Sequence, residues 1–162
     1  MIEVDDSRVA AAIARLSVSV KDFRPALRSV GQDLVENIRL CFRDSKSPWG
    51  DKWADLSPVT IALRRKNSDK PLLDTGVLRN SFTQKVTANE LTVGTNKVYA
   101  KTQQFGAARG QFGTTWRGAP IPWGNIPPRP FMPIDPSGEA DLPPDWMDDV
   151  IDSLEYHIDP DN

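Results

Sequence analysis

The sequence predicts an α+β domain in which long N-terminal helices pack on a small, mostly antiparallel sheet. Three observations lead to this prediction. Apolar residues recur at helical spacing through residue 41, they alternate between residues 82 and 93, and ten of the 14 prolines follow residue 119. The 162 residues are enough to bury one core. We therefore expect a main domain over 1–135 and an acidic helical tail over 136–162.

Two apolar stripes predict the N-terminal helices. A helix over about 5–20 is indicated by Val9, Ile13, Leu16 and Val20, and a longer one over 22–44 by Phe23, Leu27, Val30, Leu34, Ile38 and Cys41. Pro25 suits the first turn of the second helix, where its missing N–H costs nothing. Cys41 is the single cysteine, so no intrachain disulfide can form, and its place on the stripe predicts a buried, unreactive thiol.

Turn residues organise the middle of the chain. Pro48 and Gly50 hold a loop over about 44–55. Ser57 followed by a proline predicts a helix cap and a short helix from Pro58 to about Lys66. A helical turn over 77–80 follows Asp74-Thr75-Gly76.

A β-hairpin is predicted next, because Phe82, Gln84 and Val86 share one face of an extended segment. Leu91 and Val93 share one face of the next, after a polar turn. A helical segment through Tyr99 and Phe105 follows it. The long Gly-rich loop 106–125 holds five glycines, and a loop of this length is either disordered or a contact element. The last helix is capped by Asp145 and carries Trp146 on its apolar face, which we expect to be core.

The Pro-rich segment 126–134 is expected to be extended, because proline disfavours helix there. We interpret it as an edge strand that a neighbouring sheet could extend.

Charge is distributed unevenly along the chain. Residues 135–162 hold ten acidic and no basic residues, so the remaining 134 residues carry a net charge of +8. Two interpretations stay open. The acidic tail is a solvated face, or the tail of one subunit meets the basic face of a neighbour, in which case assembly weakens as salt rises.

No pattern in the sequence indicates catalysis. One histidine and one cysteine, far apart, cannot form a metal site, and we expect no metal and no cofactor. Asp74-Thr75-Gly76 is better explained by a turn than by an aspartic-protease loop, which needs a second carboxylate. No apolar run approaches the ~18 residues that a membrane span needs. We expect a non-enzymatic, soluble protein made in a reducing cytoplasm, without membrane contact.

The tryptophans and one basic segment allow two interpretations each. Trp49 and Trp53 either pack beneath their loop or anchor a partner. Trp116 and Trp123 are either intersubunit anchors or locally packed. The basic segment Arg64-Arg65-Lys66 is either a solvated helix end or a contact to nucleic acid.

A family resemblance rests on an ordered set of motifs. They are Pro48-Trp49-Gly50, Trp53, Leu56-Ser57 and Thr60; Leu72-Leu73-Asp74-Thr75-Gly76, Leu78 and Ser81-Phe82; Val93-Gly94-Thr95, Tyr99-Ala100 and Gln104-Phe105-Gly106; and Ile126-Pro127-Pro128-Arg129-Pro130-Phe131. Over about residues 20–135 the chain resembles the tail completion or virion morphogenesis proteins of tailed phages, among them protein S of P2-like phages and protein G of Mu-like phages.

The resemblance implies a structural virion protein of the head–tail junction and no catalysis. The expected subunit assembles in the host cytoplasm as a homo-oligomeric ring at the head-proximal end of the tail, in the neck. Its expected partners are the tail terminator or tail tube and the head-closure or connector proteins, with genomic DNA passing through the lumen. Two alternatives stay open: a tail terminator at the same location, and a nucleic-acid-binding module that uses the basic body.

A ring subunit needs contact residues, and we expect them in the loops and in the Pro-rich segment. We expect Arg129 and Phe131 to serve ring contacts and not the fold of the single subunit. The candidate interface residues are Trp49, Trp53, Phe105, Arg109, Trp116, Arg117, Trp123, Arg129 and Phe131.

Overall fold

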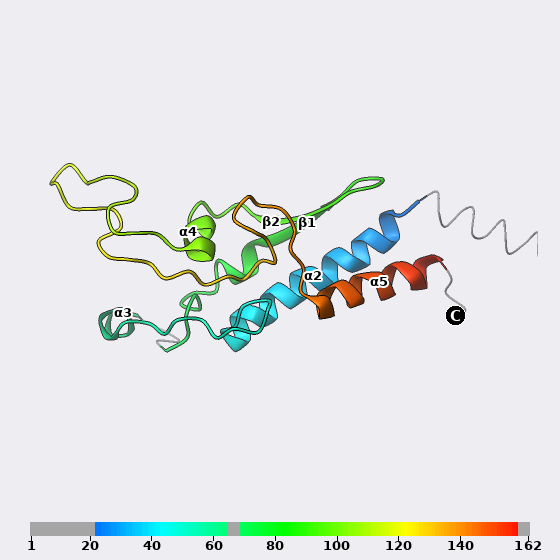
Figure 1. Ribbon diagram of the computed structural model, residues 1–162, viewed down its shortest axis with the longest axis horizontal. Helices are drawn as coiled ribbons and strands as arrows, with labels where there is room; N and C mark the ends of the chain where they lie inside the picture. Colours follow the sequence, from blue (N-terminus) through cyan, green and yellow to red (C-terminus); the bar gives the residue numbers. More distant parts are fainter. Residues whose placement is uncertain (1–21, 65–68, 159–162) are drawn as a thin grey trace, which may run out of the picture. The chain divides into compact units, whose positions relative to one another are not determined.

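A computed structural model describes residues 22–64 and 69–158 (Figure 1). It contains helices and one two-stranded antiparallel sheet, which confirms the α+β prediction. The chain forms two compact units: unit 1 comprises described residues of 22–34, 84–93 and 144–158, and unit 2 comprises those of 35–83 and 94–143. The predicted helix over 5–20 lies outside the described residues, and the division at residue 135 stays a prediction.

Helix α2 (Arg24–Asp44) confirms the longer of the two predicted helices and contributes residues to both units. Asp22 precedes it and accepts the backbone N–H of Arg24 at 3.1 Å and its guanidinium at 2.8 and 2.7 Å. These bonds favour the carboxylate and lower the pKa of Asp22 to about 2. The buried side of α2 carries Ala26, Val30, Val35, Ile38, Cys41 and Phe42.

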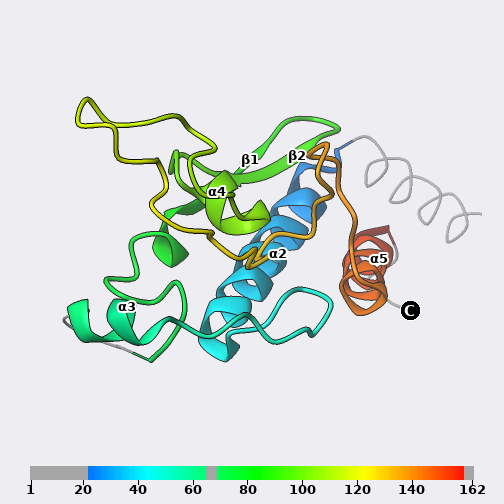
Figure 2. The same ribbon diagram turned by 60° about the vertical axis from the view of Figure 1, so that its left-hand side comes forward.

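Unit 1 packs part of the hairpin against the first turns of α2 (Figure 2). The hairpin consists of β1 (Phe82–Val86) and β2 (Leu91–Thr95), closed by a 2.9 Å bond from the Thr87 N–H to the Glu90 carbonyl. A Cβ at Gly31 would collide with the side chains of Gln84 and Leu91. Glycine at this position therefore allows helix and hairpin to approach closely.

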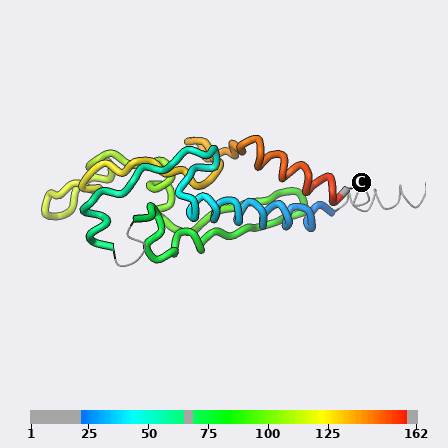
Figure 3. The backbone as a smooth tube through the Cα atoms, turned by 90° about the horizontal axis from the view of Figure 1, so that it is seen from below, coloured from blue at the N-terminus to red at the C-terminus, as the bar shows by residue number. Residues whose placement is uncertain are grey.

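Helix α5 (Pro144–Ile158) runs beside α2 within unit 1 (Figure 3). Its Trp146 is 7% exposed, which confirms the expected core position. The His157 ring lies 6.3 Å from the Phe23 ring, and Ser153 Oγ donates to Asp33 Oδ2 at 3.5 Å. The helix begins one residue before the predicted cap, with proline in its first turn.

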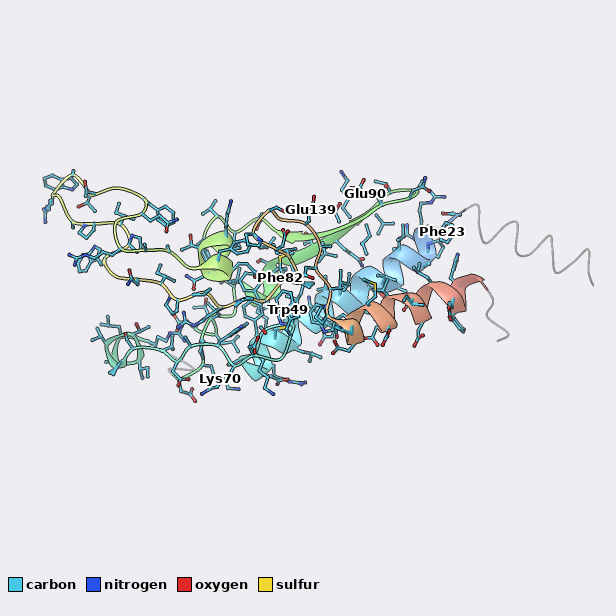
Figure 4. All side chains as sticks on the ribbon, in the orientation of Figure 1. Phe23, Trp49, Lys70, Phe82, Glu90 and Glu139 are labelled. Atoms are coloured by element: carbon cyan, nitrogen blue, oxygen red, sulfur yellow. The ribbon has the colours of Figure 1, made fainter. Side chains whose placement is uncertain are left out.

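Unit 2 is built around a cluster of four buried aromatic rings, labelled at Phe82 in Figure 4. Phe42 lies at the centre, with ring-centroid distances of 5.5 Å to Trp53, 6.0 Å to Phe82 and 5.2 Å to Phe131. Phe82 and Phe131 are 5.6 Å apart in an edge-to-face arrangement. Such spacings are those of favourable aromatic pairs, so the cluster joins four distant parts of the chain into one core.

Three short helical elements complete unit 2. Helix α3 (Pro58–Leu63) begins at Ser57, whose Oγ accepts the Thr60 N–H at 3.2 Å, as predicted. It ends before the predicted Lys66 because Arg64 adopts an extended conformation and its N–H closes the last turn on the Ile61 carbonyl. The turn η1 (Arg79–Ser81) and helix α4 (Ala100–Phe105) lie where helical segments were expected.

The segment 126–134 is extended, but it is not an open edge strand. Four of its nine residues are prolines and have no N–H. All five remaining N–H groups are already bonded: Ile126 to the Ala107 carbonyl, Arg129 to the Gln103 carbonyl, Phe131 and Met132 to Gln104 Oε1, and Ile134 to the Met132 carbonyl. The segment therefore has no donors left for a neighbouring sheet, and the expectation of strand addition here was wrong.

The aromatic cluster predicts a large loss of stability for Phe131→Ala. Phe131 is 1% exposed, and removing such a ring leaves a cavity and should cost about 3–5 kcal/mol in the free energy of unfolding. Phe112→Ala is the matched control, because that ring is 54% exposed and its loss should cost no more than about 0.5 kcal/mol. Urea unfolding of both variants makes the comparison, and equal losses would contradict the core assignment.

The buried position of Cys41 predicts a thiol that reacts slowly in the folded protein. The side chain is 6% exposed, and burial raises its pKa to about 12. Only the thiolate reacts, so labelling at pH 8 should be on the order of a thousandfold slower in the folded chain than in guanidinium. Because Cys41 is the single cysteine, the labelling rate reports this site alone. Equal rates in the two conditions would show that the helix face is open.

An exposed aromatic loop as candidate functional site

The loop 106–125 has a hydrogen-bonded backbone of its own (yellow-green to yellow in Figure 1). At its base Ala107 and Ile126 exchange two bonds, of 3.0 and 2.8 Å. Further out, the N–H groups of Gly110, Phe112 and Thr115 donate to the carbonyls of Pro122, Ile121 and Ala119 at 2.8–3.0 Å. Of the two expectations for this loop, disorder or contact, the bonded backbone argues against disorder, and the contact stays a prediction.

Gln104 fixes the chain that returns from the loop. Its side chain is 3% exposed, and Oε1 accepts the N–H groups of Phe131 and Met132 at 2.9 and 3.1 Å. Its Nε2 donates to the Met132 carbonyl at 2.8 Å. With these three bonds, the buried amide holds the backbone of the returning chain. The Gln104-Phe105-Gly106 motif by itself gives no sign of this role, because the bonded residues lie 27 and 28 positions further along the chain.

At Gly106 the chain leaves α4 with φ +76°, a conformation that favours glycine. A Cβ there would lie 2.6 Å from the Ile126 carbonyl oxygen, which is closer than real contacts allow. The glycine of the Gln104-Phe105-Gly106 motif therefore permits both the turn and the close approach of the two ends of the loop.

Large apolar side chains of the loop are exposed. Trp116 is 87% exposed, Trp123 79%, Phe112 54% and Ile121 38%. The guanidinium of Arg117 lies 4.4 Å from the centroid of the Trp116 ring, within the range of a cation–π contact. Local packing does not cover either indole, so the interpretation of Trp116 and Trp123 as anchors is the one that the geometry favours. We call Phe112, Trp116, Arg117, Ile121 and Trp123 the loop patch.

The loop lies in a stretch of chain without negative charge. Residues 91–134 contain five Lys and Arg and no Asp or Glu. Arg109, an exposed candidate of the sequence analysis, belongs to this stretch, and its N–H is held by Asn125 Oδ1 at 2.9 Å. The loop therefore presents apolar and basic groups together, which suits a partner surface that combines apolar and acidic groups.

Three predicted interface residues are core residues of unit 2. Trp53 is 2% exposed, Arg129 6% and Phe131 1%. A side chain so deeply buried has almost no surface to offer a partner, so the interface proposed below omits these three. The alternatives for the first tryptophan pair thus separate: Trp53 is core, whereas Trp49 remains 41% exposed.

Arg129 and Trp53 bond the same part of the core. Arg129 Nε and Nη2 donate to the carbonyls of Ala54 and Asp55 at 2.9 and 3.2 Å, and Trp53 Nε1 donates to the Pro130 carbonyl at 2.6 Å. Burial lowers the pKa of Arg129, yet a guanidinium stays protonated in proteins. The Pro-Pro-Arg-Pro-Phe motif thus links the 44–55 loop to the chain that leaves the loop 106–125.

Two further features of unit 2 are the candidate interface residue Phe105 and the exposed helix α3. Phe105, at the end of α4, is half-buried. Helix α3 buries no residue, and its Val59 and Leu63 are 70% and 80% exposed. With only six residues, α3 is too short to form a wide buried face.

Clusters of metal ligands and membrane-spanning helices are both absent from residues 22–64 and 69–158. Nowhere in that part of the chain do three or more His, Cys, Asp or Glu residues lie together as metal ligands would. In the same residues, no helix has the length and apolar character that spanning a membrane requires. Arg65 and Lys66 of the basic segment lie outside the described residues.

Comparison with known proteins gives the chain a family. Residues 4–149 match the phage virion morphogenesis family. The chain is 30% identical over 148 residues to Mu-like prophage FluMu G protein 2 of Haemophilus influenzae (strain ATCC 51907 / DSM 11121 / KW20 / Rd), an alignment that covers 91% of this chain and 93% of that protein. No solved structure matches the chain. The match over most of its length confirms the resemblance drawn from the motifs, and this chain belongs to the phage virion morphogenesis family.

Proposed function

We propose that this protein is a structural, non-enzymatic subunit of the head–tail junction of a tailed phage. It forms a homo-oligomeric ring in the neck, at the head-proximal end of the tail, and allows head and tail to join. Its further partners are the tail terminator or tail tube on one side and head-closure or connector proteins on the other. It assembles in the host cytoplasm and remains in the virion. Membership of the virion morphogenesis family supports this proposal.

The exposed loop patch is the observation that supports the proposal most strongly. A bonded backbone and a buried base present Trp116 and Trp123 to solvent at 87% and 79% exposure. Tryptophan is the residue most enriched among interface hot spots, and a rigid base reduces the entropy lost on docking. A loop patch of this kind suits an assembly contact that forms after the subunit has folded.

Magnitudes favour a closed ring over a single pairwise contact. Burying an aromatic side chain removes about 150–250 Å² from water, which is worth roughly 4–6 kcal/mol per ring at ~25 cal/mol/Å². Association costs about 4–15 kcal/mol in lost translational and rotational freedom. Two indoles therefore yield a weak pair, whereas in a ring every subunit makes two contacts and closure stabilises each of them.

A nucleic-acid-binding module is the second candidate function. It is favoured by the acid-free stretch 91–134 and by Arg117 stacked on Trp116, because basic groups beside aromatic rings suit single-stranded nucleic acid. A ring of this kind would serve both functions, because its lumen would pass DNA. A tail terminator at the same location is an alternative within the structural class.

The ring proposal predicts that assembly depends on the two loop tryptophans. Mass measurement by light scattering should give a multiple of 18.0 kDa for the wild type and a single chain for Trp116→Ala/Trp123→Ala, which loses the apolar contact. Val98→Ala is the matched control: its side chain is 94% exposed but lies outside the loop, so assembly should be unchanged. Circular dichroism checks that each variant is folded.

Two results would overturn the ring. One is a wild-type chain that stays monomeric at every concentration tested. The other is a double variant that assembles as the wild type does. A gel shift with single-stranded and duplex DNA in 50 and 200 mM salt examines the second candidate, and tight, salt-dependent binding by the monomer would favour that function instead.

A further inference from the structure

The exposed flank of α5 carries apolar and acidic residues side by side. Met147 and Ile151 are one helical turn apart and are 43% and 44% exposed. At 100° per residue Asp148, Asp152 and Glu155 lie on the adjoining flank. The opposite flank holds the buried Trp146 and the residues that contact the start of α2. We call Met147, Asp148, Ile151, Asp152 and Glu155 the α5 patch.

Among residues 22–64 and 69–158, the acids of the α5 patch have no ion-pair partner. No Lys or Arg occurs from residue 135 to the end of the chain. The ion pairs found over 22–64 and 69–158 involve Asp22, Glu36, Asp44 and Asp55, and none involves an acid of α5. Exposed acids beside exposed apolar side chains form a surface that a basic, apolar partner would complement.

The loop patch has the complementary composition. It combines exposed indoles with Arg117, and Arg109 lies nearby in a stretch that has no acid at all. Each patch therefore carries what the other lacks. Such matching raises the encounter rate, suppresses pairing of like patches and fixes the register of the contact.

We infer that the loop patch of one copy docks on the α5 patch of a second copy, so that this pair of surfaces is the ring contact. The inference rests on the proposed function and names its partner surface. The two patches differ, so the contact is head-to-tail: each chain offers one loop and one α5 flank. A head-to-tail contact is the kind that closes a ring, whereas pairing of two identical patches would stop at a dimer.

Charge reversal tests the inference in the full-length protein. The loop variant is Arg109→Glu/Arg117→Glu, and the α5 variant is Asp148→Lys/Asp152→Lys. Each places like charges across the contact, so each alone should shift from the assembly mass to the 18.0 kDa of one chain. Each matched control shifts the net charge by the same amount as its variant, but at residues outside the two patches. The control for the loop variant is Lys97→Glu/Lys101→Glu, and the control for the α5 variant is Asp51→Lys/Glu90→Lys. Both controls should assemble.

Mixing the loop variant with the α5 variant distinguishes a contact between two copies from a contact within one copy. In an equal mixture, the unchanged loop of the α5 variant meets the unchanged α5 of the loop variant, and the two reversed patches also match. Assembly should therefore return, with the two variants alternating in equal numbers by native mass spectrometry. A contact of the loop with α5 of its own chain would not be restored by mixing.

Each outcome of these measurements supports or overturns the inference. Loss of assembly in both variants with recovery in the mixture supports the inference. Assembly of the α5 variant alone as the wild type overturns the inference and leaves the ring intact. Loss without recovery also overturns it, because the contact is then not between these two patches of different copies. A monomeric wild type overturns the ring and the inference together.

Discussion

The packing of Phe42, Trp53, Phe82 and Phe131 is the interaction on which unit 2 depends. These rings come from α2, the 44–55 loop, β1 and the Pro-rich segment, so one cluster joins parts of the chain up to 89 positions apart. The side chains of Arg129, Trp53 and Gln104 hydrogen-bond backbone groups of the 44–55 loop and of the Pro-rich segment. The ends of the loop 106–125 are thereby fixed at its base.

Two groups of aromatic residues in unit 2 thus have different tasks. One group is buried and determines where the loop begins and ends. The other, with Trp116 and Trp123, remains in solvent on a backbone that is bonded without a partner. A monomer gains nothing by exposing indoles, since burial of apolar surface is what stabilises folded chains. Exposure on a rigid base is explained when a second molecule covers the rings.

Sequence reasoning predicted the elements whose signal is local. The α2 stripe, the Ser57 cap, the hairpin alternation and the α5 face follow from spacing, because helix and strand periodicity repeats along the chain. It misassigned Arg129 and Phe131, since nothing within a proline-rich run reveals partners such as Phe42 and Ala54 far away in sequence. The same limit hid the exposure of Phe112 and of α3, because burial is decided by tertiary contacts. The aromatic and glycine motifs did indicate the family, since their order is itself a sequence pattern.

If the loop patch is the assembly contact, assembly covers the loop and leaves the core unchanged. Hydroxyl-radical footprinting of the five tryptophans, on the isolated subunit and on purified virions, measures this most directly. We expect strong protection of Trp116 and Trp123 in the particle, with Trp53 and Trp146 unreactive in both states. Equal oxidation of Trp116 and Trp123 in subunit and virion would contradict it.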